Sequence, residues 1–165
     1  MVTHAKQIGA EQRLRELGIN LPAAPTPFGP YVTGVETGNL LFLSGMLPTE
    51  GHAPKVVGRL GKELDLEAGR HAAYVATLNA LAVAKQYLGS LDKVSRVVRL
   101  GVSLATSDEF SEHIKVADAA SELLRDIFGA ERISSRLIFG VASLPLRVPV
   151  ELELIFEFVA IGERA

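Results

Sequence analysis

Four ionisable residues near the C-terminal end carry the strongest chemical signal in the 165-residue sequence. Glu151, Glu153 and Glu157 alternate with apolar residues that begin at Val150, so a β-strand there would place three carboxylates on one face. Arg136 opens the preceding run of strand-forming residues. A guanidinium can hold a ligand carboxylate through two parallel hydrogen bonds, and a nearby carboxylate can accept a proton from water. Three acids without a base on one face, close to an arginine, therefore indicate a small-molecule site.

Each of these residues also has a plain structural interpretation. An arginine at a strand start is usually a solvated side chain that pairs with a surface acid, and such a pair contributes little stability. Glu151 can equally be a half-exposed strand residue. The residue types alone do not decide between a structural and a functional role, so the motifs around them are needed to decide.

These residues lie in a segment that reads as two β-strands joined by a short turn. The first strand is expected over residues 136–142 and the second over residues 150–159. Residues 143–147 lie between them and are few enough for a hairpin. The second strand offers an apolar face to the core, made of Val150, Leu152, Leu154, Phe156 and Phe158.

The motifs of this segment resemble the end of the RidA family (YjgF-like, also known as endoribonuclease L-PSP). The sequence has SSR ending at Arg136, LP at residues 144–145 and VELE at residues 150–153. The family usually has Pro-x-Arg, then Leu-Pro, then a Val/Ile-Glu-Ile-Glu strand. The order and the spacing of the three motifs agree with that pattern.

Three stretches earlier in the chain agree with this resemblance. Residues 29–31 (GPY) are similar to the family's N-terminal motif, and residues 43–48 (LSGMLP) to the Ser-Gly-Gln-x-Pro motif that ends its second strand. Residues 97–104, followed by DEF at 108–110, are similar to its fourth strand and to the start of its second helix. The resemblance covers about residues 26–159.

The resemblance implies an enamine/imine deaminase. In this reaction, water adds to the imine carbon of a 2-aminoacrylate-type intermediate, and ammonia leaves to give a 2-keto acid. Arg136 and Glu151 would be the catalytic residues: Arg136 would anchor the substrate carboxylate, and Glu151 would orient and deprotonate the attacking water. Tyr31, Ser44 and Gly45 would help to bind the substrate.

The sequence departs from the family pattern at positions that bear on the substrate. Asp118, on the second long helix, is the nearest match to an asparagine that faces the pocket in the family's best-known branch, and is therefore a further substrate-binding candidate. An ionised Asp118 would repel a bound carboxylate. Met46 and Leu137 stand where a glutamine and a small polar residue are usual, which favours a larger or more apolar pocket. Glu153 and Glu157 match no site of the family and are interpreted as structural or solvated.

Three functions remain open at this point. The first is the enamine/imine deaminase, which the intact Arg136 and Glu151 favour. The second is a non-catalytic trimer that binds a carboxylate metabolite in the same pocket, which Asp118 favours. The third is an endoribonuclease, as the family's older label suggests. The formal net charge of −2 and the lack of a basic stripe in the sequence argue against strong binding of nucleic acid.

The composition argues against several other kinds of site. There is no cysteine for a disulfide, a thiolate metal site or a nucleophile. The four histidines show no metal-binding spacing: His4, His52, His71 and His113. Neither a metal nor another cofactor is expected. No apolar run approaches the roughly 20 residues that cross a bilayer, and residues 1–20 lack the apolar core of a signal peptide, so a cytoplasmic location is expected.

The periodicity of the remaining chain predicts one α+β domain. The expected elements are strands at 31–36, 40–44, 56–60 and 93–104 and helices at 66–88 and 111–128. With the final two strands this gives the order ββ(β)αβαββ, with two helices on one face of a mixed sheet. The resemblance implies the chorismate-mutase-like fold of RidA proteins. An N-terminal helix at 5–17 and a proline-rich linker are assigned to residues 1–25, and the domain itself to residues 26–165.

Two helices can cover only one face of such a sheet. Ile155, Val159 and either Ile138 or Phe139 would lie on the other face, and an uncovered apolar face argues for self-association. The resemblance implies a homotrimer in which three sheets pack into a central barrel. A pocket for a small anionic metabolite would then lie at each subunit boundary. No nucleic acid and no membrane partner is expected.

Overall fold

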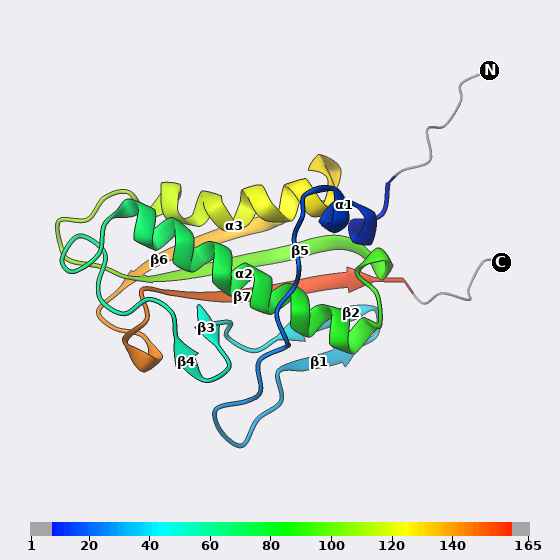
Figure 1. Ribbon diagram of the computed structural model, residues 1–165, viewed down its shortest axis with the longest axis horizontal. Helices are drawn as coiled ribbons and strands as arrows, with labels where there is room; N and C mark the ends of the chain where they lie inside the picture. Colours follow the sequence, from blue (N-terminus) through cyan, green and yellow to red (C-terminus); the bar gives the residue numbers. More distant parts are fainter. Residues whose placement is uncertain (1–7, 160–165) are drawn as a thin grey trace.

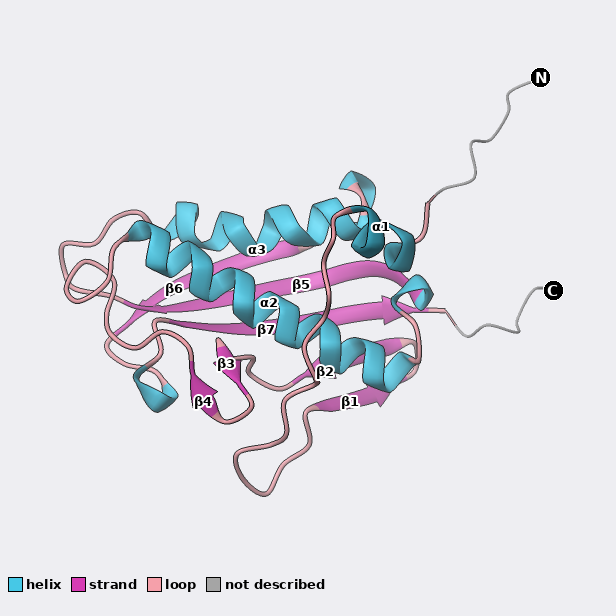
Figure 2. Ribbon diagram, viewed as in Figure 1, coloured by secondary structure: helices cyan, strands magenta, loops and turns pink. Residues whose placement is uncertain are grey.

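A five-stranded mixed sheet with two long helices across one face makes up most of the computed structural model, which describes residues 8–159 (Figures 1 and 2). The strands of the sheet are β1 (Gly34–Thr37), β2 (Leu40–Leu43), β5 (Val94–Ala105), β6 (Ser135–Val141) and β7 (Val150–Phe158). The helices are α1 (Ala10–Glu16), α2 (Leu66–Leu88) and α3 (His113–Phe128). The strand order is β1-β2-β7-β5-β6, so β6 forms one edge. The predicted fold class, an α+β domain with two helices on one face of a mixed sheet, is confirmed.

Helix α2 begins and ends where the sequence predicts, because both ends carry strong local signals. The Asp65 side chain accepts a hydrogen bond from the backbone N–H of Ala68 at 2.9 Å and caps the first turn. Gly89 follows the last turn in the left-handed conformation, with φ of 79°. Helix α3 begins at His113, two residues after the predicted start at Ser111, and no side chain caps it.

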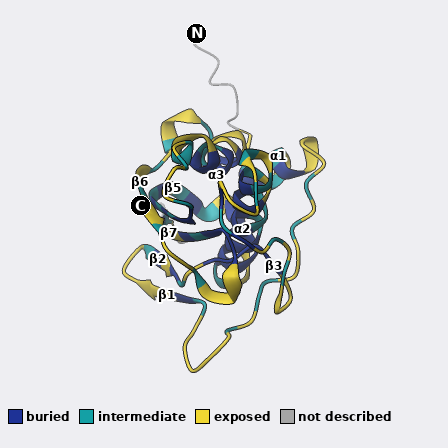
Figure 3. Cartoon of the chain, turned by 90° about the vertical axis from the view of Figure 1, so that its left-hand side faces the viewer, coloured by how far each residue is buried: buried dark blue, intermediate teal, exposed yellow. Residues whose placement is uncertain are grey.

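The core lies between the helices and the sheet (Figure 3). The helix-facing side of β7 contributes Val150, Leu152, Leu154 and Phe156, all fully buried. Alanines on the buried side of α2, including Ala72, Ala73, Ala76 and Ala80, let the helix approach the sheet closely. Each strand residue that alternates with this apolar set therefore points to the opposite, open face of the sheet.

The predicted hairpin of the last two strands is wrong. Strand β5 lies between β6 and β7, and it pairs in parallel with β6 and antiparallel with β7. The end of β5 separates the two: the N–H of Ala105 donates to the carbonyl of Pro149 at 3.0 Å, and the N–H of Thr106 donates to that of Val141 at 3.2 Å. The connection that crosses this end includes the short 3₁₀ turn Pro145–Arg147.

The short third strand predicted at residues 56–60 is not formed there. Residues 56–60 form no strand of the sheet, and Leu60 makes only isolated bridges, to Leu64 and to Thr106. A small separate hairpin precedes them, made of β3 (Thr49–Glu50) and β4 (Ala53–Pro54). Two further 3₁₀ turns, Leu91–Lys93 and Ala130–Arg132, join the helices to β5 and β6.

Helix α1 joins the ends of the two long helices. Glu11 pairs with Lys85 at 2.8 Å and accepts the N–H of Leu91 at 3.0 Å, while Arg13 donates to the carbonyl of Asp126 at 3.4 Å. Leu14 is buried. The predicted stripe that also included Ile8 and Leu17 is wrong, since both are exposed. The predicted helix start at residue 5 lies outside the described residues. The chain then crosses the outer side of α2 before β1 (Figure 1).

Within residues 8–159, no helix is long and apolar enough to cross a membrane.

The burial of Phe156 gives a direct test of this core. Its side chain is 0% exposed and lies against Phe128, with 6.1 Å between ring centroids. We expect Phe156→Ala to lower the free energy of unfolding by about 3–5 kcal/mol, because the lost apolar contacts leave a cavity. Ile114→Ala, at a site 63% exposed on α3, should change it by about 0.5 kcal/mol or less. Urea unfolding of both variants measures the difference, and similar losses would contradict the assigned core.

Candidate functional site

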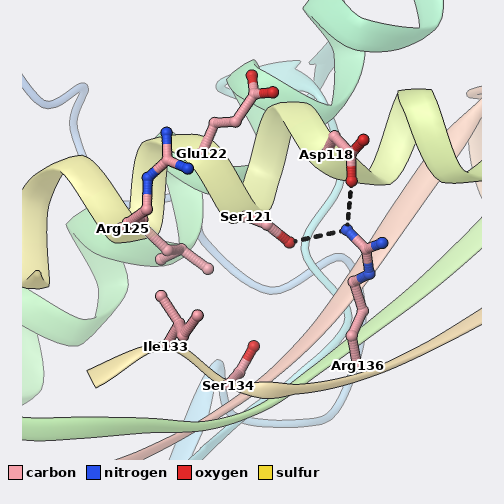
Figure 4. A pocket seen from close by; sticks show the side chains of 8 residues that line it. Asp118, Ser121, Glu122, Arg125, Ile133, Ser134 and Arg136 are labelled. Atoms are coloured by element: carbon pink, nitrogen blue, oxygen red, sulfur yellow. Dashed lines mark hydrogen bonds and ion pairs between the residues drawn. The ribbon is translucent and has the colours of Figure 1, made fainter. Parts of the chain in front are cut away.

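Arg136 lies at the start of the edge strand β6 with its side chain on the helix-facing side. Its partner in β5 is Leu100, a core residue, so the two share that face. The Nη1 atom donates to Oδ1 of Asp118 at 2.8 Å and to Oγ of Ser121 at 3.0 Å (Figure 4). The Arg136 and Asp118 side chains are 26% and 38% exposed. The structure thus brings two of the predicted site residues, Arg136 and Asp118, into direct contact.

A hollow of about 420 Å³ opens beside this ion pair. Its lining comes from α3 and from the chain that enters β6: Asp118, Ser121, Glu122, Leu124, Arg125, Ile133, Ser134 and Arg136. Only Nη1 of Arg136 has a hydrogen-bond partner among the described residues, so Nη2 and Nε stay available. That edge of a guanidinium can bind a carboxylate with two parallel hydrogen bonds.

Glu151 lies on the open face of the sheet, since its neighbours Val150 and Leu152 point into the core. It is half-buried, and burial raises the pKa of its carboxyl above the usual glutamate value. Within residues 8–159 no hydrogen bond or ion pair to its side chain is found. A carboxylate that is partly desolvated and has no partner is a stronger proton acceptor than a solvated one.

The other two acids of this face have partners. Glu153 pairs with Nε of Arg99 at 3.2 Å. Glu157 accepts hydrogen bonds from Ser95 Oγ at 2.8 Å and from Asn39 Nδ2 at 3.3 Å. The open face therefore contains a base, Arg99 of β5, that the pattern of β7 alone did not indicate. These contacts agree with structural roles for Glu153 and Glu157.

Gly45 provides the space that the Glu151 carboxylate occupies. A Cβ at this position would lie 2.0 Å from Oε1 of Glu151, so any other residue here would force the Glu151 side chain to move. The next residue, Met46, exchanges two backbone hydrogen bonds with Leu152 at 2.8 and 2.9 Å, so the turn after β2 is fixed against β7. The glycine of the Ser-Gly motif thus leaves the space in which the Glu151 carboxylate lies.

Ser44 and Tyr31 are held by the loop before β1. The Ser44 hydroxyl donates to the carbonyl of Val32 at 2.6 Å, and its N–H donates to that of Thr33 at 2.9 Å. The Tyr31 hydroxyl accepts the N–H of Phe28 at 3.1 Å, and the ring is partly exposed. Gly45 is therefore the predicted residue that lies against Glu151, whereas the hydrogen bonds of the Ser44 and Tyr31 hydroxyls are to the loop before β1.

The predicted residues thus form two separate groups in one chain. The first group, Arg136 and Asp118, faces the helices, and the second group, Glu151 with Ser44 and Gly45, lies at the open face. Sequence reasoning missed Ser121, although its spacing of three from Asp118 places both on one side of a helix. Among the described residues, no three histidine or acidic side chains converge as metal ligands.

Comparison with known proteins places the chain among well-defined relatives. The profile of the family described as "YjgF/chorismate_mutase-like, putative endoribonuclease" matches residues 11–160. Protein TCP17 of Trypanosoma cruzi is 39% identical over 145 residues, which cover 87% of this chain and 91% of that protein. A 2-iminobutanoate/2-iminopropanoate deaminase of Dermatophagoides farinae is 29% identical, over 83% of this chain and 92% of that protein. The crystal structure of a "putative endoribonuclease" from Shewanella oneidensis MR-1 superposes with a TM-score of 0.87 and 32% identity, over 92% and 100% of the two chains.

The raised pKa of Glu151 has a consequence for stability. Since the folded-state pKa lies above the ordinary value of about 4.3, the fold is favoured by protonation of this carboxyl. The contribution of the protonated carboxyl to the free energy of unfolding is complete at pH values below the ordinary pKa. It is lost as the pH rises through the folded-state pKa. We expect Glu151→Gln to have a higher melting temperature than the unmodified protein near pH 7 and no advantage near pH 3. Thermal unfolding across this pH range measures the effect.

Glu153→Gln is the matched control, because it removes one charge from the same strand face but breaks the ion pair with Arg99. No gain in melting temperature is expected for it near pH 7. Equal gains for the two variants would mean that relief of general negative charge, not the burial of Glu151, causes the effect.

Proposed function

Since the chain belongs to the YjgF/chorismate mutase-like family, the RidA family, we propose that it is an enamine/imine deaminase. The proposed reaction converts 2-aminoacrylate-type intermediates to 2-keto acids and ammonia. The observation that carries this proposal is the Arg136 guanidinium, which lines a hollow and has no hydrogen-bond partner at Nη2 and Nε among the described residues. The similarity to the Dermatophagoides farinae protein named as a deaminase supports the same reaction.

Arg136 would bind the substrate carboxylate and thereby fix the position of the adjacent imine carbon. The enamine first tautomerises to the imine, which already reacts with water, so anchoring the carboxylate and positioning a water molecule supply the main acceleration. Arg136 is prepared for this task because Asp118 and Ser121 hold its Nη1 end. Lysine could not offer the same planar pair of donors.

Glu151 would act as the general base. Its carboxylate accepts a proton from the water as the oxygen attacks the carbon of the protonated imine, and the C=N double bond becomes a C–N single bond. Glu151 then returns this proton to the nitrogen of the resulting carbinolamine. The C–N bond breaks to release ammonia, and the hydroxyl oxygen gives its proton to the Glu151 carboxylate as the C=O bond of the 2-keto acid forms. The raised pKa of Glu151 favours this exchange of a proton near neutral pH.

These two residues would meet only across a subunit boundary. In one chain Arg136 faces α3, while Glu151 lies on the opposite face of the sheet. A second copy that brings its open face to the β6 edge would supply the missing half, as in the homotrimer expected for the family. Apolar side chains exposed on this face and its edge support such an assembly: Val35, Phe42, Leu137 and Phe139.

Two other functions receive less support. A non-catalytic binding trimer would use the same pocket, and Asp118 beside Arg136 favours it over the deaminase because the best-known branch of the family has an asparagine there. Some relatives are named endoribonucleases. The formal net charge of −2 argues against that function here, because RNA binding usually needs a strongly basic surface. We place the deaminase activity in the cytoplasm and expect no cofactor.

Removal of the guanidinium tests the site assignment. We expect Arg136→Ala to lose at least about 100-fold in the rate of keto-acid release from imines generated by an amino-acid oxidase, because the substrate is no longer anchored. Arg136→Lys should recover little of this loss, since it keeps the charge without the paired donors. Release as fast as that of the unmodified protein would show that the pocket is not the site. Size-exclusion chromatography checks that the assembly is unchanged.

Mixing two inactive variants tests the shared site. Arg136→Ala and Glu151→Gln chains are denatured together in equal amounts and refolded. In random trimers, about a quarter of the boundaries would combine an intact Arg136 with an intact Glu151 from the neighbouring chain. We expect recovery of about that fraction of activity, whereas each variant refolded alone stays inactive. No recovery in the mixture would contradict a site shared between subunits.

A further inference from the structure

We propose that Asp118 makes the Arg136 pocket selective for bipolar ligands, namely 2-imino or 2-keto acids whose side chain carries a positive charge. This inference rests on the proposed function only in placing the ligand carboxylate on Arg136. It adds a substrate class that the family resemblance does not provide, since the family's best-known branch has an asparagine at the position nearest to Asp118.

The charges around the hollow are balanced before any ligand enters. Its lining contains two acids, Asp118 and Glu122, and two bases, Arg125 and Arg136. A ligand with one negative charge therefore approaches a neutral ion pair, and its carboxylate comes close to that of Asp118. A ligand with a second negative charge is repelled more strongly by Asp118. A cationic group on the ligand offsets this repulsion, because it is attracted to the same carboxylate.

Asp118 is the acid that can meet such a cation. Its Oδ1 accepts from Arg136, and its Oδ2 has no partner among the described residues. The side chain is 38% exposed and borders the hollow (Figure 4). The other acid, Glu122, is engaged at 2.9 Å by Arg70 of α2. A ligand whose carboxylate lies on the Nη2 and Nε edge of Arg136 can therefore place a cation against Asp118.

A Ser121 variant can distinguish the charge of Asp118 from its role in positioning Arg136. Ser121 is uncharged, but its hydroxyl accepts a hydrogen bond from the same Nη1 atom of Arg136, at 3.0 Å. Loss of this hydroxyl should loosen the guanidinium for every ligand alike. Loss of the Asp118 charge should instead change the order in which ligands of different charge are bound.

The test is binding of three stable 2-keto acids by isothermal titration calorimetry at low ionic strength. The acids are 2-oxoglutarate with two negative charges, 2-oxohexanoate with one, and 5-guanidino-2-oxopentanoate with one negative and one positive charge. For the unmodified protein we expect affinity to rise in that order. Asp118→Asn should lower the preference for the guanidino acid over 2-oxohexanoate by a factor of about five, the upper range for a partly exposed ion pair.

Two matched variants complete the design. Ser121→Ala should weaken all three acids by a similar factor and keep their order. Glu112→Gln removes one negative charge at the start of the same helix, about 9 Å from Asp118 along its axis. Its partner Lys115 does not line the hollow, so the order and the ratios should stay unchanged. An unmodified protein that binds 2-oxohexanoate or 2-oxoglutarate as tightly as the guanidino acid would overturn the inference. So would an Asp118→Asn variant with the original preference.

Imine hydrolysis is measured separately on the same preparations. If the order of affinities holds and no imine is hydrolysed faster than in buffer, the pocket inference stands and the deaminase proposal fails. If imines are hydrolysed but the affinities do not depend on ligand charge, the deaminase proposal stands and the inference about Asp118 fails.

Discussion

The pairing of strand β5 along both of its edges is the constraint on which the candidate site depends. Its parallel register with β6 places Arg136 beside Leu100, and its antiparallel register with β7 places Glu151 beside Ser103. Residues paired across a sheet share a face, and successive residues alternate between faces. A shift of one residue in either register would turn Arg136 away from α3 or force Glu151 under the helices. The burial of Leu100, Leu152 and their neighbours prevents such a shift.

Elements with strong local signals could be predicted from the sequence. Helix α2 has both of its predicted ends because Asp65 and Gly89 act on the adjacent turns alone. Strand β5 lies within one residue of its predicted bounds at each end, since alternation along a strand is also a local property. The family motifs identified Arg136, Asp118, Ser44, Gly45 and Glu151 before any packing was known. Their assigned roles in binding and catalysis remain predictions.

What could not be predicted depends on contacts between distant segments. A connection of residues 143–147 fits a hairpin by its length, and only the insertion of β5 between the two strands excludes it. For the same reason the sequence did not show that Arg99 would neutralise Glu153, or that Arg136 would lie on the other face from Glu151. Gly45 matched a motif, but its physical reason, the space taken by the Glu151 carboxylate, needs the fold.

The contact between Arg136 and Asp118 has two opposing effects on ligand binding. It holds a long side chain in one position, so a ligand does not bear the full loss of rotamer freedom, which is about 2 kcal/mol for arginine. It also neutralises the guanidinium, which weakens its attraction for any simple anion. The first effect favours a ligand that can form hydrogen bonds to the free edge of the guanidinium. The second disfavours anions that are attracted to the guanidinium by charge alone. In the proposed assembly the Arg136 half of the site would thus bind weakly by itself. Chemistry would then require the Glu151 half from a neighbouring chain, which confines hydrolysis to the completed boundary.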